Sequence, residues 1–307
     1  MLTIDFINVG YGDAILIREQ TGSSHFCMLV DCGDTAADSV PANSCRTDAA
    51  AYLNEEGVSH IDLLVLTHLH RDHIGGMERL LERVTIDGLW TPYLPPPELR
   101  QVRLAAKGDY SKTAKSICQT LNMLLDAAEP LETRGCRLTE VHESQKGYRL
   151  TPALSADISC QQQYLYARQR RVLEEALLGR PDRFELDYIG QFTNITGIRL
   201  RLTYHGRAIV LPADVYAGFW DYEQNDPCYI LKVPHHACGG ALTEELLKKL
   251  RPEHAVVSVS NDRGDNRPSA EAIGLLKQYA GSIQFTDAVS ILGMEAQYHS
   301  SVRFVIE

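Results

Sequence analysis

A dense run of histidines follows an apolar segment in the first quarter of the chain. The segment 61–66, IDLLVL, is apolar apart from Asp62 and short enough to be a strand buried on both faces. The next ten residues, 67–76, are THLHRDHIGG, with three histidines and one aspartate within six positions. The two glycines allow a tight turn into a helix that we predict over 76–83. The pattern therefore predicts a strand, a polar loop at its carboxyl end and a helix.

The side chains of this loop are ligands that zinc prefers, imidazole and carboxylate. Alternating positions on an extended loop allow His68 and His70 to point the same way. Asp72 and His73 follow where the chain turns toward the helix, so they can bind a second ion beside the first. A single histidine would be an ordinary surface residue, but three at this spacing favour metal binding. We expect two divalent ions, with Zn²⁺ preferred and Mn²⁺ as the alternative.

Strands and helices alternate along the whole length, which favours an α/β architecture around one continuous core. We predict strands over 2–7, 14–17, 26–30, 61–66, 198–204, 208–211, 229–233 and 255–259. We predict helices over 49–56, 76–83, 112–128, 164–178, 243–250 and 269–278.

The stretch 91–190 differs from the rest in character. A triple proline, Pro95–Pro97, interrupts it, and two helical segments follow. Because strands of the earlier type resume at Ile198, we expect an insertion or lid region within a single domain that spans residues 1–307. Basic residues of this stretch are candidates for phosphate contacts, although solvated helix faces are an equal alternative. They are Arg100, Arg103, Lys107, Lys112, Lys115, Arg168, Arg170 and Arg171.

Composition excludes several classes of protein. The 307 residues are 44% hydrophobic and 23% charged, which is typical of a globular chain. A net charge of −10 excludes a generally basic nucleic-acid-coating protein. No apolar run approaches the roughly 18 residues of a membrane span, and Asp5 interrupts what would be the apolar part of a signal peptide. We therefore expect a cytoplasmic protein with no membrane association, whose eight cysteines are reduced.

The pattern His-x-His-x-Asp-His after a strand resembles the signature of the metallo-β-lactamase superfamily. The resemblance implies an αββα four-layer sandwich, here with a helical insertion. It implies that Asp31, in Leu-Val-Asp-Cys-Gly, orients the histidine loop without binding an ion. Asp214, in Leu-Pro-Ala-Asp, resembles the aspartate that bridges two ions, and His235 and His236 resemble the last histidine motif. The ligands implied in this way are His68, His70, Asp72, His73, Asp214, His235 and His236.

A narrower resemblance extends from the first strand to about Thr286 and is broken by the insertion. The segments 8–17, 194–200 and 232–236 are similar to the hydrolase domain of ComEC-type competence DNA-uptake proteins and their stand-alone relatives. Within the first segment, Asp13 is either a turn cap or a residue of the site. The membrane channel of the uptake proteins has no counterpart here, so the resemblance does not imply DNA import.

The chain departs from these relatives at three places. Asn194 stands where the superfamily usually has a histidine, and an amide oxygen is a weaker ligand than imidazole. Where the branch has His-His-Gly-Ser, this chain has His-His-Ala-Cys, and we interpret Cys238 as a packed residue and not as a ligand. Arg267 precedes Pro268 where the branch often has a histidine, so Arg267 is a candidate for contact with substrate.

The resulting hypothesis is a metal-dependent hydrolase, a phosphodiesterase or nuclease that uses a metal-bound hydroxide. Asp72 and Asp214 would hold the ions and accept a hydrogen bond from the nucleophile. Whichever of His235 and His236 is not a ligand would donate a proton to the leaving oxygen, and the sequence does not choose between them. Two alternatives stay open: hydrolysis of a small carbonyl substrate such as a thioester, lactone or β-lactam, and a metal-binding partner protein without turnover. The sequence predicts neither protein partners nor an oligomeric state.

Overall fold

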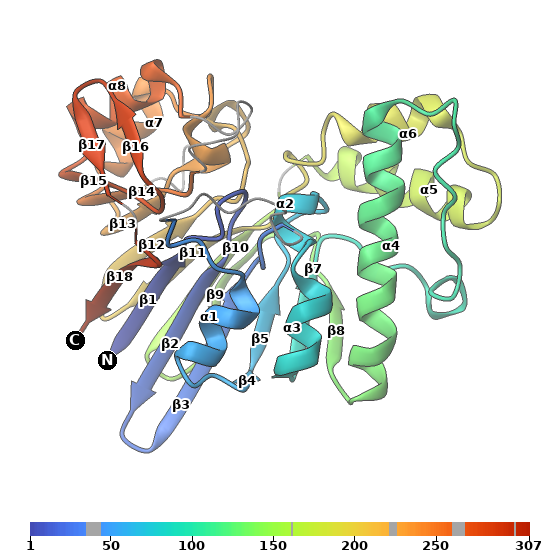
Figure 1. Ribbon diagram of the computed structural model, residues 1–307, viewed down its shortest axis with the longest axis horizontal. Coiled ribbons are helices and arrows are strands. Elements are labelled where there is room, and N and C mark those ends of the chain that lie inside the picture. Colours follow the sequence, from blue (N-terminus) through green and yellow to red (C-terminus); the bar gives the residue numbers. More distant parts are fainter. Residues whose placement is uncertain (35–43, 161, 221–225, 260–267, 298) are drawn as a thin grey trace.

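Two seven-stranded sheets face each other, with helices on their outer faces, in the computed structural model shown in Figure 1. The structure describes residues 1–34, 44–160, 162–220, 226–259, 268–297 and 299–307. The N- and C-terminal strands are neighbours in the first sheet, so the two ends of the chain lie close together (Figure 1).

The first sheet has the strand order β18-β1-β2-β3-β5-β7-β8. Its strands are β1 (Leu2–Ile7), β2 (Ile15–Thr21), β3 (Ser24–Val30), β5 (Leu63–Val65), β7 (Gly88–Thr91), β8 (Arg137–Glu140) and β18 (Ser301–Ile306). Strands β18, β1, β2 and β3 pair antiparallel, whereas β3, β5, β7 and β8 pair parallel. The predicted hairpin is present as β2 and β3, and its register pairs Ile15 with Val30.

The second sheet has the order β15-β14-β13-β12-β11-β10-β9. Its strands are β9 (Gln145–Arg149), β10 (Leu154–Ser159), β11 (Arg199–Tyr204), β12 (Arg207–Leu211), β13 (Ile230–Lys232), β14 (His254–Val257) and β15 (Ser282–Phe285). The pairs from β12 to β15 are parallel, and the pairs from β9 to β12 are antiparallel. Each sheet thus combines a parallel part with an antiparallel part.

The helices cover the outer faces of the sheets. They are α1 (Ala49–Glu55), α2 (Arg71–Ile74), α3 (Met77–Arg83), α4 (Lys112–Thr133), α5 (Gln163–Leu177), α6 (Arg183–Gly190), α7 (Glu244–Leu250) and α8 (Ala270–Tyr279). Short pieces complete the described elements: β4 (His60–Ile61) with β6 (Thr85–Ile86), β16 (Val289–Ile291) with β17 (Met294–Ala296), and 3₁₀ turns at 97–99, 217–219 and 234–237.

Three apolar layers hold these elements together, as the alternation of side chains along each strand requires. Leu2, Ile4 and Phe6 of β1 point between the sheets, where they join residues of β10 to β14 such as Leu200. A second layer lies between the first sheet and helices α1, α3, α4, α5 and α6. A third, which includes Leu231, lies between the second sheet and helices α7 and α8. This arrangement confirms the predicted αββα sandwich.

The stretch 91–190 contributes to both sheets as well as to the helical region. It supplies β8 to the first sheet and β9 and β10 to the second. In β10, Leu154, Ala156 and Ile158 are buried at alternate positions, which is the pattern of a strand that packs on one face. Only the segments 97–133 and 163–190 form the helical group beside β8 in Figure 1. The organisation of the chain as one domain remains a prediction.

Among the described residues, no helix is both long and apolar enough to cross a membrane.

Candidate metal centre

Loops at the carboxyl ends of strands from both sheets meet at one place. Asp31 follows β3, the histidine loop follows β5, Asp214 follows β12 and the pair at 235–236 follows β13. Because parallel strands present their carboxyl ends at one edge, ligands far apart in sequence come together there.

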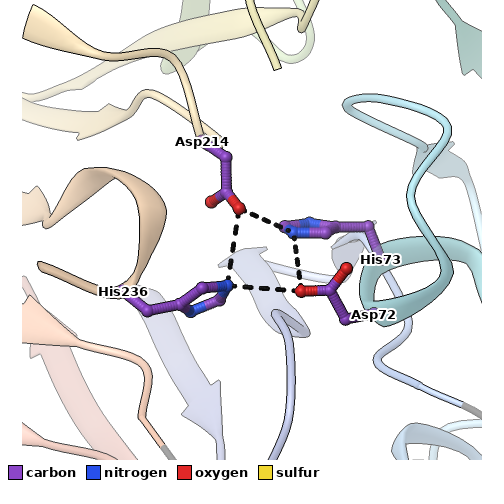
Figure 2. Close-up of side chains that lie close together, drawn as sticks. All are labelled: Asp72, His73, Asp214 and His236. Atoms are coloured by element: carbon purple, nitrogen blue, oxygen red, sulfur yellow. Dashed lines mark hydrogen bonds and ion pairs between the residues drawn. The ribbon is translucent and has the colours of Figure 1, made fainter. Parts of the chain in front are cut away.

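Four side chains form the centre of this site (Figure 2). The Nε2 atom of His73 lies 3.7 Å from Oδ2 of Asp72 and 3.3 Å from Oδ2 of Asp214. The Nε2 atom of His236 lies 3.5 Å and 3.4 Å from the same two oxygens. These four ligand atoms lie within 4.8 Å of one another, so one small cation could contact all of them.

The imidazoles of His73 and His236 are each oriented by a hydrogen bond at Nδ1, the nitrogen that faces away from the cluster. Nδ1 of His73 lies 2.8 Å from Oδ2 of Asp31, and Nδ1 of His236 donates to the Ser258 carbonyl oxygen at 3.0 Å. With a proton at Nδ1, each neutral ring would present the Nε2 lone pair to a cation bound between the two carboxylates. Nε2 of His236 is buried and has no hydrogen-bond partner among the described residues. A bound cation would satisfy that atom.

A second donor set lies beside the first. Nε2 of His68 is 3.2 Å from Nδ1 of His70, and Nδ1 of His68 is 3.0 Å from the Thr67 hydroxyl. The Asn194 amide lies against the His70 ring. Within the described part of the chain, Oδ1 of Asn194 is buried without a hydrogen-bond partner. Two imidazole nitrogens and one unsatisfied amide oxygen fit a second, weaker cation site.

Asp31 and Asp13 lie behind the histidines. Asp31 accepts hydrogen bonds from the backbone N–H and the hydroxyl of Thr67, both at 2.7 Å, in addition to its contact with His73. It therefore fixes the start of the histidine loop as well as one ring. The backbone N–H of Asp13 donates to the Asp72 carbonyl oxygen, and its carboxylate lies 3.8 Å from Nδ1 of His73.

His235 and His236 occupy different environments although they are adjacent. Three successive residues, His235, His236 and Ala237, have φ of 44°, 53° and 60°, and this left-handed turn directs His236 inward. The His235 side chain is 24% exposed, with Nε2 3.9 Å from Oδ2 of Asp214 and Nδ1 3.1 Å from Sγ of Cys238. The geometry thus favours His236 over His235 as a ligand. Arg267 lies outside the described residues.

The charges of the cluster favour a positive charge at its centre. Burial opposes charge on all four central groups, but their mutual attraction outweighs it. The pKa values of Asp72 and Asp214 are lowered, that of His73 is raised, and that of His236 is raised to about 10. Burial, together with neighbouring imidazoles, lowers the pKa values of His68, His70 and His235, which favours neutral rings. The raised pKa values of His73 and His236 favour protonated rings beside the two carboxylates.

Gly12 lets the first loop approach the site closely. Its φ is +108°, and an added Cβ would lie 1.7 Å from the Asp72 carbonyl oxygen. Only glycine satisfies both conditions. The close approach brings Asp13 against the histidine loop, which accounts physically for the Gly-Tyr-Gly-Asp sequence.

The sequence interpretation missed Lys232, the last residue of β13. Its side chain is fully buried, and its ammonium group contacts Oδ2 of Asp13 and lies 3.3 Å from Oδ1 of Asp214. The available signal was a lysine at the end of an apolar strand, three residues before His235.

The basic residues of the helical region are largely paired with carboxylates. Ion pairs join Arg168 and Arg171 to Glu185, and Arg170 to Glu140. Arg100 and Arg103 likewise pair with Glu132 and Asp126. The charges of these five arginines are therefore balanced by carboxylates, which weakens the case for a basic groove.

A two-layer β core between helices, with a histidine and aspartate cluster at the strand ends, defines a metallo-β-lactamase-fold protein. Residues 7–100 match the family model described as the metallo-beta-lactamase superfamily. The match covers the part of the chain that holds the histidine loop, and it agrees with the fold.

The relatives found by comparison are distant. The chain is 22% identical over 300 residues to ComE operon protein 3 of Bacillus subtilis (strain 168), covering 92% of this chain and 32% of that protein. The chain thus spans about a third of the length of that relative. Similar solved structures include the metallo-beta-lactamase fold protein YhfI from Bacillus subtilis, with a TM-score of 0.47, 11% identity, and coverage of 93% of this chain and 96% of that one. A diphosphatase from the PhnP family has a TM-score of 0.46 and 12% identity, with coverage of 100% and 98%.

Proposed function

We propose that the chain is a metal-dependent phosphodiesterase that binds two divalent ions, Zn²⁺ or Mn²⁺. The observation that carries the proposal is the pair of adjacent donor sets, one of Asp72, His73, Asp214 and His236, the other of His68, His70 and Asn194. The charge of Asp214 also influences the pKa values of His68 and His70, so Asp214 is placed to serve both sets.

Asp72, Asp214 and His235 would have different roles in the proposed hydrolysis. When bound, the two ions would supply Lewis acidity and activate a water molecule. Asp72 and Asp214 would hold the ions and accept a hydrogen bond from that water, as the sequence suggested. His235 is the histidine left at the exposed edge of the site, so it would contact the leaving oxygen.

A phosphodiester is favoured over a carbonyl substrate for two reasons. The central set contains two carboxylates, Asp72 and Asp214, and adjacent ions held by such ligands recur in phosphoryl-transfer sites. The sequence resemblance to ComEC-type hydrolase domains points the same way. The arginine pairs and the net charge of −10 mean that a nucleic acid would be attracted by the ions themselves, and not by the helical region.

The experiment is a substrate comparison on metal-reconstituted protein. Bis-p-nitrophenyl phosphate, single-stranded DNA, duplex DNA and RNA are tested with Mn²⁺ and with Zn²⁺, beside nitrocefin, a lactone and a thioester. We expect hydrolysis of at least one phosphodiester, abolished by Asp214→Ala and unchanged by Asp126→Asn on the surface of α4. Faster turnover of a carbonyl substrate would contradict the proposal. Metal binding without any turnover would instead support the partner-protein alternative.

Two further proposals concern the domain organisation and the location of the protein. We propose that residues 1–307 act as one domain, because the candidate ligands at 68–73, 214 and 235–236 meet at one site. We also propose a cytoplasmic location, from the sequence argument given above.

A further inference from the structure

We propose that Lys232 is a positioning residue of the metal centre: its ammonium group holds one oxygen of Asp214, so that the other faces the candidate ligands. The inference rests on the proposed metal site. It assigns a role to a residue that neither the ligand motifs nor the proposed mechanism uses.

The Lys232 side chain is buried, and hydrogen-bond acceptors surround its ammonium group. Its side chain is 1% exposed. The ammonium group contacts Oδ2 of Asp13, lies 3.3 Å from Oδ1 of Asp214 and donates to the Ala213 carbonyl oxygen at 3.2 Å. An ammonium group has three N–H donors, and here three acceptors face it. A buried charge is tolerated only when it is paired in this way.

The contacts join the two halves of the site. Asp13 belongs to the loop between β1 and β2 in the first sheet, whereas Asp214 follows β12 in the second sheet. Lys232 lies at the end of β13, which pairs with β12, so its ammonium group links the two loops across the site. Among the described residues, His73 also lies near both carboxylates, but it is itself a candidate ligand.

The link determines how Asp214 is presented. With Oδ1 held by Lys232, rotation of the carboxylate is restricted, and Oδ2 faces Nε2 of His73 and His236 (Figure 2). Ala213 has φ of 54°, so the backbone before Asp214 is in the left-handed region, and Lys232 also holds its carbonyl oxygen. Lys232 thus secures both the side chain and the preceding peptide of Asp214.

A simpler role would be to neutralise Asp13 and stabilise the fold. Positioning of Asp214 and neutralisation of Asp13 predict different metal affinities once Asp13 has lost its charge. In Asp13→Asn, Lys232 still holds Asp214, whereas in the double variant Asp13→Asn/Lys232→Met one negative and one positive charge are both removed and Asp214 is left unheld. The comparison of these two variants isolates the contact with Asp214.

The experiment measures metal binding directly. Zn²⁺ affinity is determined by chelator competition and Co²⁺ coordination by visible absorption, with melting temperatures as a check of folding. The set comprises wild type, D13N, K232M and D13N/K232M, and K248M as the matched control, since Lys248 forms an exposed ion pair with Glu244 on α7. Turnover of bis-p-nitrophenyl phosphate is recorded separately.

We expect K232M to melt at a lower temperature and D13N/K232M to recover much of that loss. The double variant should nevertheless bind Zn²⁺ about 10–100-fold more weakly than D13N, with a changed Co²⁺ spectrum, as is typical when a residue that orients a ligand is removed. K248M should match wild type. Equal affinity and spectra in D13N and D13N/K232M would overturn the role of Lys232. Metal binding without turnover in the wild type would overturn the proposed function and leave the role of Lys232 standing.

Discussion

At the residue scale, the site depends on contacts made behind the candidate ligands. The imidazoles of His73 and His236 are each held at Nδ1, by Asp31 and by the Ser258 carbonyl oxygen. These contacts determine which ring nitrogen faces the carboxylates. The position of Asp31 relative to the histidine loop could be expected from sequence, whereas the choice between His235 and His236 depends on a left-handed turn that sequence does not reveal.

Asp31→Asn should weaken Zn²⁺ binding about 10–100-fold, since it removes the carboxylate that orients His73. Affinity measured by chelator competition checks this. Asp126→Asn, at an exposed ion pair with Arg103, provides the control. Unchanged affinity in Asp31→Asn would contradict the orienting role of Asp31.

His236→Ala and His235→Ala should have different effects. His236→Ala should lose bound metal because its buried Nε2 lies beside both carboxylates. His235→Ala should keep the metal content of the wild type but lower kcat, because its side chain lies at the exposed edge of the site. Metal content by mass spectrometry and kinetics on bis-p-nitrophenyl phosphate distinguish the two. Loss of metal in His235→Ala alone would reverse the assignment.

At the element scale, tight turns and ion pairs set how the strands and helices approach one another. The β1–β2 loop contacts the histidine loop through Gly12, and Arg18 and Arg303 join β2 and β18 to Glu56 at the end of α1. Such contacts link elements distant in sequence. Local patterns therefore predicted many of the elements but not their ion pairs, as the arginines of α5 also illustrate.

Gly12→Ala should lower the free energy of unfolding by about 3 kcal/mol or more, since strained backbone alone costs about 1–3 kcal/mol and the new Cβ would also collide with the Asp72 carbonyl oxygen. Gly22→Ala is the matched control. Gly22 also has positive φ, +61°, but has nothing within 4 Å of an added Cβ, and should lose only about 1–2 kcal/mol. Urea unfolding measures both, and equal losses would contradict the close approach.

Glu56 should contribute stability that depends on pH. Burial acts to raise its pKa, but hydrogen bonds and charges from Arg303 and Arg18 outweigh burial and lower it. Because the folded-state pKa is below the unfolded-state value, the stabilisation is present above about pH 4.3 and is lost as pH falls through the folded-state value. Glu56→Gln should thus cost about 0.5–1 kcal/mol at pH 7 and progressively less in acid. Urea unfolding across pH tests this against Glu55→Gln, and a cost independent of pH would contradict it.

At the scale of the whole molecule, the sequence predicted the αββα class and the segments that meet at the site. The class followed from the resemblance to the metallo-β-lactamase superfamily, and the segments followed from the His-x-His-x-Asp-His loop and Asp214, which each come after an apolar strand. It did not predict that β8, β9 and β10 lie within the supposed insertion, because the pairing partners of these strands are fixed only by the assembled sheets. Lys232 was missed for a similar reason, since its partners come from two different sheets.

The central claim is that the cluster of Asp72, His73, Asp214 and His236 is a metal centre. Anomalous X-ray diffraction at the zinc absorption edge, on crystals of Zn²⁺-loaded protein, tests it most directly. We expect a strong peak among those four side chains and a second, weaker peak beside His68, His70 and Asn194. Crystals of loaded protein with no peak among the four side chains, or with zinc bound elsewhere, would contradict it.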